Sequence, residues 1–388
     1  MLKVFKKNWL LVSLVFLLIT LGMVFIYSAS SYSAAVRYND SFYFVKKQLV
    51  GFLMGLVVML FFINFNYHKF LKLKWAVVAV SLILLVLVFI PGLGKSNYGA
   101  NRWITIGGFS LQSSEVAKFG FVIFSACYLS KNYQKTKTFW GVVPIMAVGG
   151  VICLLILLEP NLSVTLCVGM VMLIMLVVGG MRAKHFLIIL IPIACLVPIL
   201  IIMEPYRLQR LVAFIDPWAS PKEEGFQLIQ SLYALGSGGL FGVGLFNSRQ
   251  KYLFLPFSES DFIFSIIGEE LGFVGCVLVI TIYAVVIWKG VKIAINASDR
   301  LGCYLASGIT SIIAVQLLIN IAVVTGSIPP TGIPLPFMSA GGTSLMVFMG
   351  AVGILLNISK GEEQNLNRVN VFKKLKVKQN KKVLKGAN

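Results

Sequence analysis

The residues best placed to do chemistry lie between positions 249 and 272, RQKYLFLPFSESDFIFSIIGEELG. Asp261 stands there at the mouth of a long apolar stretch, and Glu269 and Glu270 follow further in. Carboxylates placed where a helix enters a membrane are costly unless they are paired or hydrated, so they are functional candidates. In a half-hydrated site, Asp261 can act as a general base that accepts a proton from a hydroxyl group. The structural alternative is a capping box, with Ser258 as N-cap and Asp261 as the third helical residue.

Helical spacing assigns roles to the other buried charges. Glu270 lies about two and a half turns beyond the candidate base and points to the opposite side, so we expect it to pack or hydrogen-bond. Glu115 and Lys118 are three residues apart at the start of an apolar stretch, so they share one helix face and can pair. A lone ammonium inside a membrane is expensive, so the pair is either a structural ion pair or part of a substrate path. Ser113 or Ser114 can cap this helix.

Basic residues also gather in the long segment 204–260. Arg207, Arg210, Arg249 and Lys251 can meet an anionic ligand, because arginine forks match phosphate oxygens. The alternative is surface charge at the lipid headgroups. The segment is rich in aromatic residues and glycine. Because this composition is not that of a disordered chain, we expect the segment to contain short helices of its own.

A third polar stretch, residues 326–344, has the sequence GSIPPTGIPLPFMSAGGTS. Its four prolines forbid a regular helix. Gly341 and Gly342, followed by Thr343 and Ser344, open the last apolar stretch. Helix N-termini of this kind can hold anions, although a plain turn with an N-cap is the simpler interpretation.

Composition places these residues in a membrane protein. Apolar residues make up 58% of the 388-residue chain and charged residues 12%, whereas soluble domains carry about a quarter charged residues. Ten stretches approach the ~20 apolar residues that span a bilayer: about 9–27, 48–64, 75–90, 115–130, 140–158, 162–180, 186–203, 262–288, 302–324 and 344–358. The first could be a cleaved signal peptide, but its apolar run is longer than a signal core, so we expect an uncleaved helix.

Charge predicts the orientation. With an even number of spans and both termini inside, 23 of the 34 lysines and arginines fall in the inner loops and termini. Of the remaining 11, five lie in the long segment before the eighth span, which the positive-inside rule leaves out. We therefore predict an all-α polytopic membrane protein with both termini cytoplasmic and one long extracellular loop, at about 204–260, before helix 8.

Residues 1–360 form the membrane domain in this interpretation, and residues 361–388 form a basic cytoplasmic tail without fixed structure. The net charge of +20 is sorted by position, and no nucleic-acid motif accompanies it. The six cysteines all fall inside apolar stretches, so we expect small hydrophobic residues rather than disulfides or metal ligands. With only two histidines, a His/Cys metal site is not expected.

Over nearly its whole length the chain resembles the SEDS family (shape, elongation, division and sporulation proteins), and it is most similar to the division and sporulation members FtsW and SpoVE. The matching segments are NRWITIGGFSLQSSEVAK, EPNLSVTL, YRLQRLVAFIDPW, FQLIQSLYALGSGGLFGVGL, SRQKYLFLP, DFIFSIIGEELGFVG and the stretch from Asn320 to Ser344. Where the family usually has LPE-x-H-x-DF, this chain has LPFSESDF, with Phe257 and Glu259 in place of Glu and His. Asp261 itself is kept.

The resemblance implies a peptidoglycan glycosyltransferase of the bacterial cytoplasmic membrane, facing the cell exterior. Its substrate would be lipid II, a disaccharide-pentapeptide on a polyprenyl diphosphate. Its partners would be a class B penicillin-binding protein, which is a transpeptidase, and other division proteins. Asp261 matches the catalytic aspartate of the family, and Glu115 and Lys118 match its polar cavity residues.

The chemistry of that reaction fits these residues. A positioned base assists the attacking hydroxyl, and cations stabilise the departing diphosphate; Arg102, Lys118, Arg249 and Lys251 are the candidates. No cofactor is expected with certainty; magnesium or manganese would aid the diphosphate, but no metal-ligand cluster is visible. Three alternatives stay open: a flippase or other transporter of lipid-linked precursors, a sporulation-specific polymerase, and a scaffold for division proteins.

Overall fold

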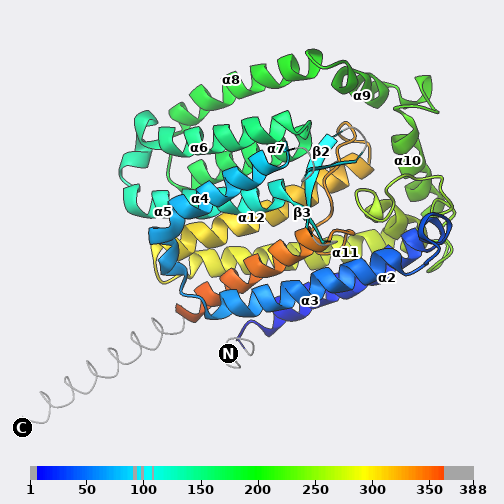
Figure 1. Cartoon of the computed structure of the whole chain (residues 1–388), viewed down its shortest axis with the longest axis horizontal. Coiled ribbons are helices and arrows are strands. Elements are labelled where there is room, and N and C mark those ends of the chain that lie inside the picture. Colours follow the sequence, from blue (N-terminus) through cyan, green and yellow to red (C-terminus); the bar gives the residue numbers. More distant parts are fainter. Residues whose placement is uncertain (1–6, 91–93, 98–99, 107–108, 362–388) are drawn as a thin grey trace, which may run out of the picture.

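A computed structural model describes residues 7–90, 94–97, 100–106 and 109–361 as a bundle of long helices with one small sheet (Figure 1). The helices of the first half are α2 (Trp9–Tyr38), α3 (Tyr43–Asn64), α4 (Phe70–Leu87), α5 (Ser113–Asn132), α6 (Phe139–Leu158), α7 (Leu162–Val178) and α8 (Ala183–Ile202). Those of the second half are α9 (Pro205–Ile215), α10 (Phe226–Gly238), α11 (Ile263–Ile295), α12 (Arg300–Val324) and a last helix, Gly342–Gly361. The prediction of a mainly helical, polytopic membrane protein is confirmed.

The described part of the chain contains seven helices that are long and apolar enough to cross a membrane. Three more, α5, α7 and α8, overlap the remaining predicted stretches. Helix α5 carries Glu115, Lys118 and Lys131, which lower its apolar character, and α7 is only 17 residues long. Each of the ten predicted stretches therefore coincides with a helix, and their number as membrane spans stays a prediction.

Helices α5, α12 and the last helix form the centre of the bundle. Helix α12 packs against α5, α7 and α11, and nearly every side chain of the last helix is buried. Close contact depends on glycine: a Cβ added at Gly51 of α3 would collide with the backbone of Gly342. Gly55, one turn later, faces Met346 and Met349 in the same way. The Gly51–Gly55 pattern thus brings α3 against the last helix.

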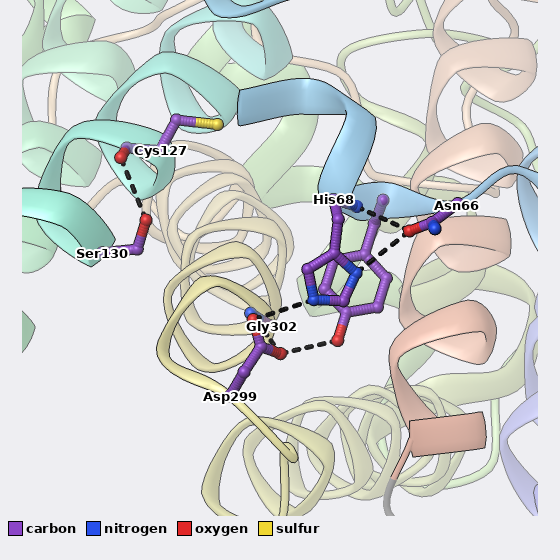
Figure 2. A network of polar contacts seen from close by, with 7 residues as sticks. Asn66, His68, Cys127, Ser130, Asp299 and Gly302 are labelled. Carbon is purple, nitrogen blue, oxygen red and sulfur yellow. Dashed lines mark hydrogen bonds and ion pairs between the residues drawn. The ribbon is translucent and has the colours of Figure 1, made fainter. Parts of the chain in front are cut away.

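The first and last described segments of the chain meet on one side of the bundle. The Asn8 amide donates a hydrogen bond of 2.8 Å to the hydroxyl of Ser359. The α3–α4 and α11–α12 loops join at the same end, where Asp299 accepts a hydrogen bond of 2.6 Å from Tyr67 and lies 3.3 Å from Nε2 of His68 (Figure 2). Both loops were predicted to be cytoplasmic together with the termini. The basic tail, from residue 362 onward, lies outside the described residues.

The long segment before α11 contains the short helices α9 and α10, as expected. Pro205 begins α9 at a position where its missing N–H costs nothing. Helix α10 packs against α11, and the Ser231 hydroxyl lies 2.8 Å from the Ser265 hydroxyl. Within α11 the backbone departs from helical geometry at Gly272, which has a φ of 68° and lies against Gly242, so only glycine fits there.

A three-stranded antiparallel sheet, which the sequence did not predict, stands between α4 and α5. Its strands are β1 (Gly94–Asn97), β2 (Ala100–Ile106) and β3 (Phe109–Gln112), in the order β1-β2-β3. Trp103 pairs with Gln112 and Ile106 with Phe109. Because β3 runs directly into α5, the sheet fixes where that buried helix begins.

Both predicted helix caps were wrong. Helix α11 begins at Ile263 with Phe262 as its N-cap, so Asp261 precedes the helix, and the Ser258 hydroxyl instead donates to the Ala29 carbonyl. Helix α5 begins at Ser113, and the residue before it makes no side-chain cap. The two serine hydroxyls donate instead to distant acceptors, Ser258 to the Ala29 carbonyl of α2 and Ser113 to the Glu159 carboxyl beyond α6.

Candidate functional site

Asp261 lies in the turn before α11, and this turn is held by hydrogen bonds from distant parts of the chain. The Asn320 amide of α12 donates 2.8 Å to the Asp261 carbonyl and 2.9 Å to the Ile333 carbonyl. The Ser339 hydroxyl donates 2.5 Å to the Ser260 carbonyl. Since Ile333 and Ser339 belong to the proline-rich loop 326–341, this loop and the turn form one unit.

The Asp261 carboxyl group is half-buried and faces the same loop. A Cβ added at Gly332 would lie 3.1 Å from Oδ2 of Asp261, so this glycine leaves the space that the carboxylate uses. Burial, and after it the negative charge of the neighbouring Glu259 carboxyl, raise the pKa of Asp261 to about 7. The pKa of Glu259 is itself raised by burial. A base with a pKa near neutrality holds a proton transiently, as general base catalysis requires.

Two arginines act against that rise. The charges of Arg102 and Arg210 lower the pKa of Asp261, and a hydrogen bond from the Ser260 side chain does the same. Arg102 stands on β2, and the Arg210 guanidinium of α9 donates 3.2 Å to the Pro330 carbonyl of the proline-rich loop. Arg102 was among the predicted substrate-binding residues, whereas Arg210 was considered only as one of several basic residues of the long segment.

Glu115 and Lys118 form the predicted pair. Their charged atoms are 2.7 Å apart, and both side chains are almost completely buried. The Ser344 hydroxyl of the last helix donates 3.2 Å to the second carboxylate oxygen of Glu115, and the Lys118 ammonium lies 5.9 Å from the centre of the Phe348 ring. A buried charge pair is tolerated when its remaining polar atoms are hydrogen-bonded, and Ser344 supplies such a bond.

The proline-rich loop and the helix that follows it connect the base to this pair. At one end of the loop lie Gly332 and Ile333, against Asp261. At the other end, the Ala340 N–H donates 2.9 Å to the Glu259 carbonyl. The next residues reach α5 and the sheet, where the Thr343 hydroxyl donates 2.5 Å to the Ser110 carbonyl. The Asp261 turn, the proline-rich loop and the start of α5 are therefore joined by one continuous series of hydrogen bonds.

Arg249 and Lys251 take other positions. Arg249 is exposed, and its backbone N–H donates 2.9 Å to Glu269. Lys251 is buried, with its ammonium hydrogen-bonded to the Phe246 carbonyl of its own loop. The cations whose charges act on Asp261 are instead Arg102 and Arg210. The side chain of Arg207 lies outside the described residues.

Glu269 and Glu270 hold the loop before α11 in place. Glu269 accepts hydrogen bonds from the Ser248 hydroxyl, at 2.5 Å, and from two backbone N–H groups of the same loop. Glu270 accepts 2.5 Å from the Ser28 hydroxyl of α2 and 3.3 Å from the Ser248 N–H. The prediction that Glu270 hydrogen-bonds rather than does chemistry agrees with this arrangement.

An apolar pocket of about 380 Å³ lies beside the buried ion pair. It is formed between α3, α4, α5 and the last helix, and its residues from α5 include Val116, Phe119 and Gly120, the neighbours of Glu115 and Lys118. Its walls are almost entirely hydrocarbon. In the described ranges, no group of three or more His, Cys, Asp or Glu side chains is arranged to hold a metal, so we assign no metal ligand.

These features define a polytopic membrane protein whose polar site combines a half-buried carboxylate, two arginines and a buried ion pair beside an apolar pocket. The chain belongs to the FtsW/RodA/SpoVE family, described as cell cycle proteins, whose model matches residues 8–364.

Relatives and solved structures agree along nearly the whole chain. The chain is 43% identical to Stage V sporulation protein E of Bacillus subtilis, over 92% of this chain and 97% of that protein. It is 39% identical to the probable peptidoglycan glycosyltransferase FtsW of a Geobacter species, over 87% and 92%. A chain of a solved peptidoglycan synthase complex superposes with a TM-score of 0.76 at 27% identity, over 92% of this chain and 98% of that chain. RodA of Thermus thermophilus has the same fold, with a TM-score of 0.65 at 24% identity over 91% and 97%.

Proposed function

We propose that this protein is a peptidoglycan glycosyltransferase that polymerises lipid II at the outer face of the cytoplasmic membrane, with Asp261 as general base. Family membership and the name of the FtsW relative support the activity. The observation that carries the assignment of the base is the Asp261 carboxyl, half-buried, with a pKa of about 7, between Glu259 and two arginines.

In the proposed reaction, a hydroxyl oxygen of one sugar attacks the anomeric carbon of a second sugar, which is the sugar that carries the diphosphate. The new glycosidic bond forms as the bond from that carbon to the diphosphate oxygen breaks. Asp261 takes the proton of the attacking hydroxyl, and the diphosphate leaves with the bonding electron pair. A positioned base contributes about 10²–10⁴-fold to such a step. With a single base and no second carboxylate acting as nucleophile, the anomeric carbon inverts.

The departing diphosphate gathers negative charge, which fixed cations stabilise. Arg102 and Arg210 are the side chains that act on the Asp261 carboxylate, so they are the first candidates for this role. Lys118 is held by Glu115 and serves as a second, deeper positive group. The adjacent apolar pocket is suited to the first part of a polyprenyl tail, since it offers hydrocarbon walls beside that charge.

The relatives support a proposal for the partner and for the cellular role. A chain of a peptidoglycan synthase complex shares the fold, and we propose that a class B penicillin-binding protein crosslinks the strands that this protein makes. Relatives include both a sporulation protein and FtsW proteins. We propose cell division as the primary role, with a sporulation-specific role as the alternative.

The decisive test is lipid II polymerisation by purified protein reconstituted with its transpeptidase. Asp261→Asn keeps the size and the backbone contacts of the turn but removes the base, so we expect at least a 10²-fold loss of glycan strand formation. The melting temperature in detergent checks that the variant is folded. Polymerisation at the wild-type rate would refute the base assignment, and lipid II translocation in vesicles without polymerisation would favour a transporter.

A further inference from the structure

A carboxyl group that has no part in the mechanism above lies just beyond the end of α6. Glu159 is fully buried, and its Oε1 accepts a hydrogen bond of 3.0 Å from the Ser113 hydroxyl at the start of α5. Its other oxygen, Oε2, is buried and makes no hydrogen bond within the described chain.

The Glu159–Pro160 turn presents its backbone to the arginine nearest the proposed base. Nε of Arg102 donates 3.3 Å to the Glu159 carbonyl, and Nη2 donates to the Pro160 carbonyl. Two donors on two successive carbonyls fix the plane of a guanidinium group as a single bond cannot. Two hydrogen bonds therefore fix Arg102 to the α6–α7 turn. Its positive charge acts on Asp261, which lies about a hundred residues beyond that turn along the chain.

We propose that Glu159 is a positioning residue: by tying the Glu159–Pro160 turn to Ser113, it aims Arg102 at Asp261 and so sets the lowest pH at which the base works. The inference rests on the proposed function of Asp261. It assigns Glu159 no contact with substrate, and its role is exercised through Arg102.

The protonation state of Glu159 determines how it positions Arg102. Burial raises the pKa of Glu159 to about 8, and the Ser113 hydrogen bond and the Arg102 charge only partly oppose that rise. Below pH 8 the group is therefore mostly the neutral acid, so it acts as a hydrogen-bonding anchor rather than as a counter-ion for Arg102. Glutamine has the same shape and is neutral, so it can take over that role.

The sign of the expected pH effect follows from the groups around the base. Arg102 and Arg210 lower the pKa of Asp261, and Glu259 raises it. If Arg102 turns away, the pKa of Asp261 rises, and the carboxylate that accepts the proton persists only at higher pH. The acidic limb of the pH–rate profile then moves to higher pH, while the rate above the limb changes less.

The experiment is the pH dependence of lipid II polymerisation by the reconstituted complex. For Glu159→Ala we expect the acidic limb to move up by about half a pH unit, which is a roughly threefold lower rate at pH 6 relative to pH 8.5. Glu159→Gln should keep the wild-type limb. Ser113→Ala, which removes the anchor from the other side, should shift it in the same direction as Glu159→Ala and serves if that variant fails to fold.

A double variant separates positioning from general damage to the fold. Arg102→Gln should shift the limb upward by itself, and Glu159→Ala added to it should produce no further shift, because both act through the same guanidinium. An additional shift in the double variant, or a limb in Glu159→Gln that moves to lower pH, would overturn the inference. If Asp261→Asn retains activity, the proposed base is wrong and the limb reports another group, which is a different failure.

Discussion

The environment of the proposed base is set by distant segments rather than by its own. Asp261 lies in the turn before α11, where the Glu259 carboxyl raises its pKa and Gly332 leaves room for its carboxylate. Glu259 stands where the family commonly has histidine, so here a second acid raises the pKa of the base. The sequence identified Asp261 correctly as a polar residue at the mouth of a helix, but it predicted a cap where the structure has an open turn.

Gly332 offers a test of the space around the carboxylate. A methyl group at this position would lie 3.1 Å from Oδ2 of Asp261, so Gly332→Ala should displace the carboxylate and slow polymerisation by about tenfold, a typical cost of misplacing a catalytic group. Gly341→Ala, in the same loop, is the matched control, since its nearest contact would be an ordinary 3.5 Å. Equal rates for the two variants would mean that the carboxylate does not need this space.

Sequence reasoning found the charges but not the groups that aim them. Glu115, Lys118 and Arg102 were identified from their types and from the resemblance. In the structure Glu115 and Lys118 pair beside the last helix, and Arg102 on β2 is bound to the α6–α7 turn while its charge acts on Asp261. Glu159 and Asn320 were not identified, because their roles depend on contacts with residues far away in the chain. Arg249 and Lys251 were selected as basic residues of the long segment that could meet an anionic ligand; in the structure the Arg249 N–H donates to Glu269 and the Lys251 ammonium donates to the Phe246 carbonyl.

Among the elements, the helices were predictable and the sheet was not. Long apolar runs specify helices wherever the backbone must satisfy its own hydrogen bonds in lipid, and every predicted run coincides with one. The segment before α5 is polar and glycine-rich, which is also typical of an irregular loop. Its strands are stabilised by pairing with one another and by the hydrogen bond from Thr343. Such contacts cannot be predicted from the local sequence pattern.

The contact between α3 and the last helix yields a prediction about stability. Gly51→Ala places a methyl group against the backbone of Gly342, which has no side chain that could move away. We expect a loss of about 1–3 kcal/mol, as for other overpacked interiors, seen as a lower melting temperature in detergent. Gly150→Ala on α6 is the control, because nothing lies near its added carbon. An unchanged melting temperature for Gly51→Ala would refute the close packing.

In the molecule as a whole, the proposed site lies at one end of the helix bundle and the predicted cytoplasmic loops lie at the other. The Asp261 turn, the sheet and the proline-rich loop lie toward one end of the bundle, and the start of α2, the end of the last helix and the α11–α12 loop with Asp299 lie toward the other (Figure 1). The positive-inside rule had assigned the second end to the cytoplasm. The polar site would then face the cell exterior, where peptidoglycan is assembled.

Cysteine labelling tests that orientation. Phe241, which follows α10 and is 80% exposed, should react as Phe241→Cys with a membrane-impermeant maleimide added to intact cells. Lys69→Cys, in the α3–α4 loop, should react only after the membrane is opened. The unmodified chain controls for its own thiols, of which Cys195 is exposed in the isolated bundle. The reverse pattern would place the site in the cytoplasm and exclude it from wall assembly.

The last helix has a consequence for how the protein is made. It contributes Ser344 to the Glu115 carboxylate, Thr343 to the sheet and Gly342 to the seam with α3. Translation reaches these residues only after all the other spanning segments have been synthesised. A nascent chain that lacks them has a charged, unclosed interior, so catalytic competence begins only when synthesis of this final segment is complete.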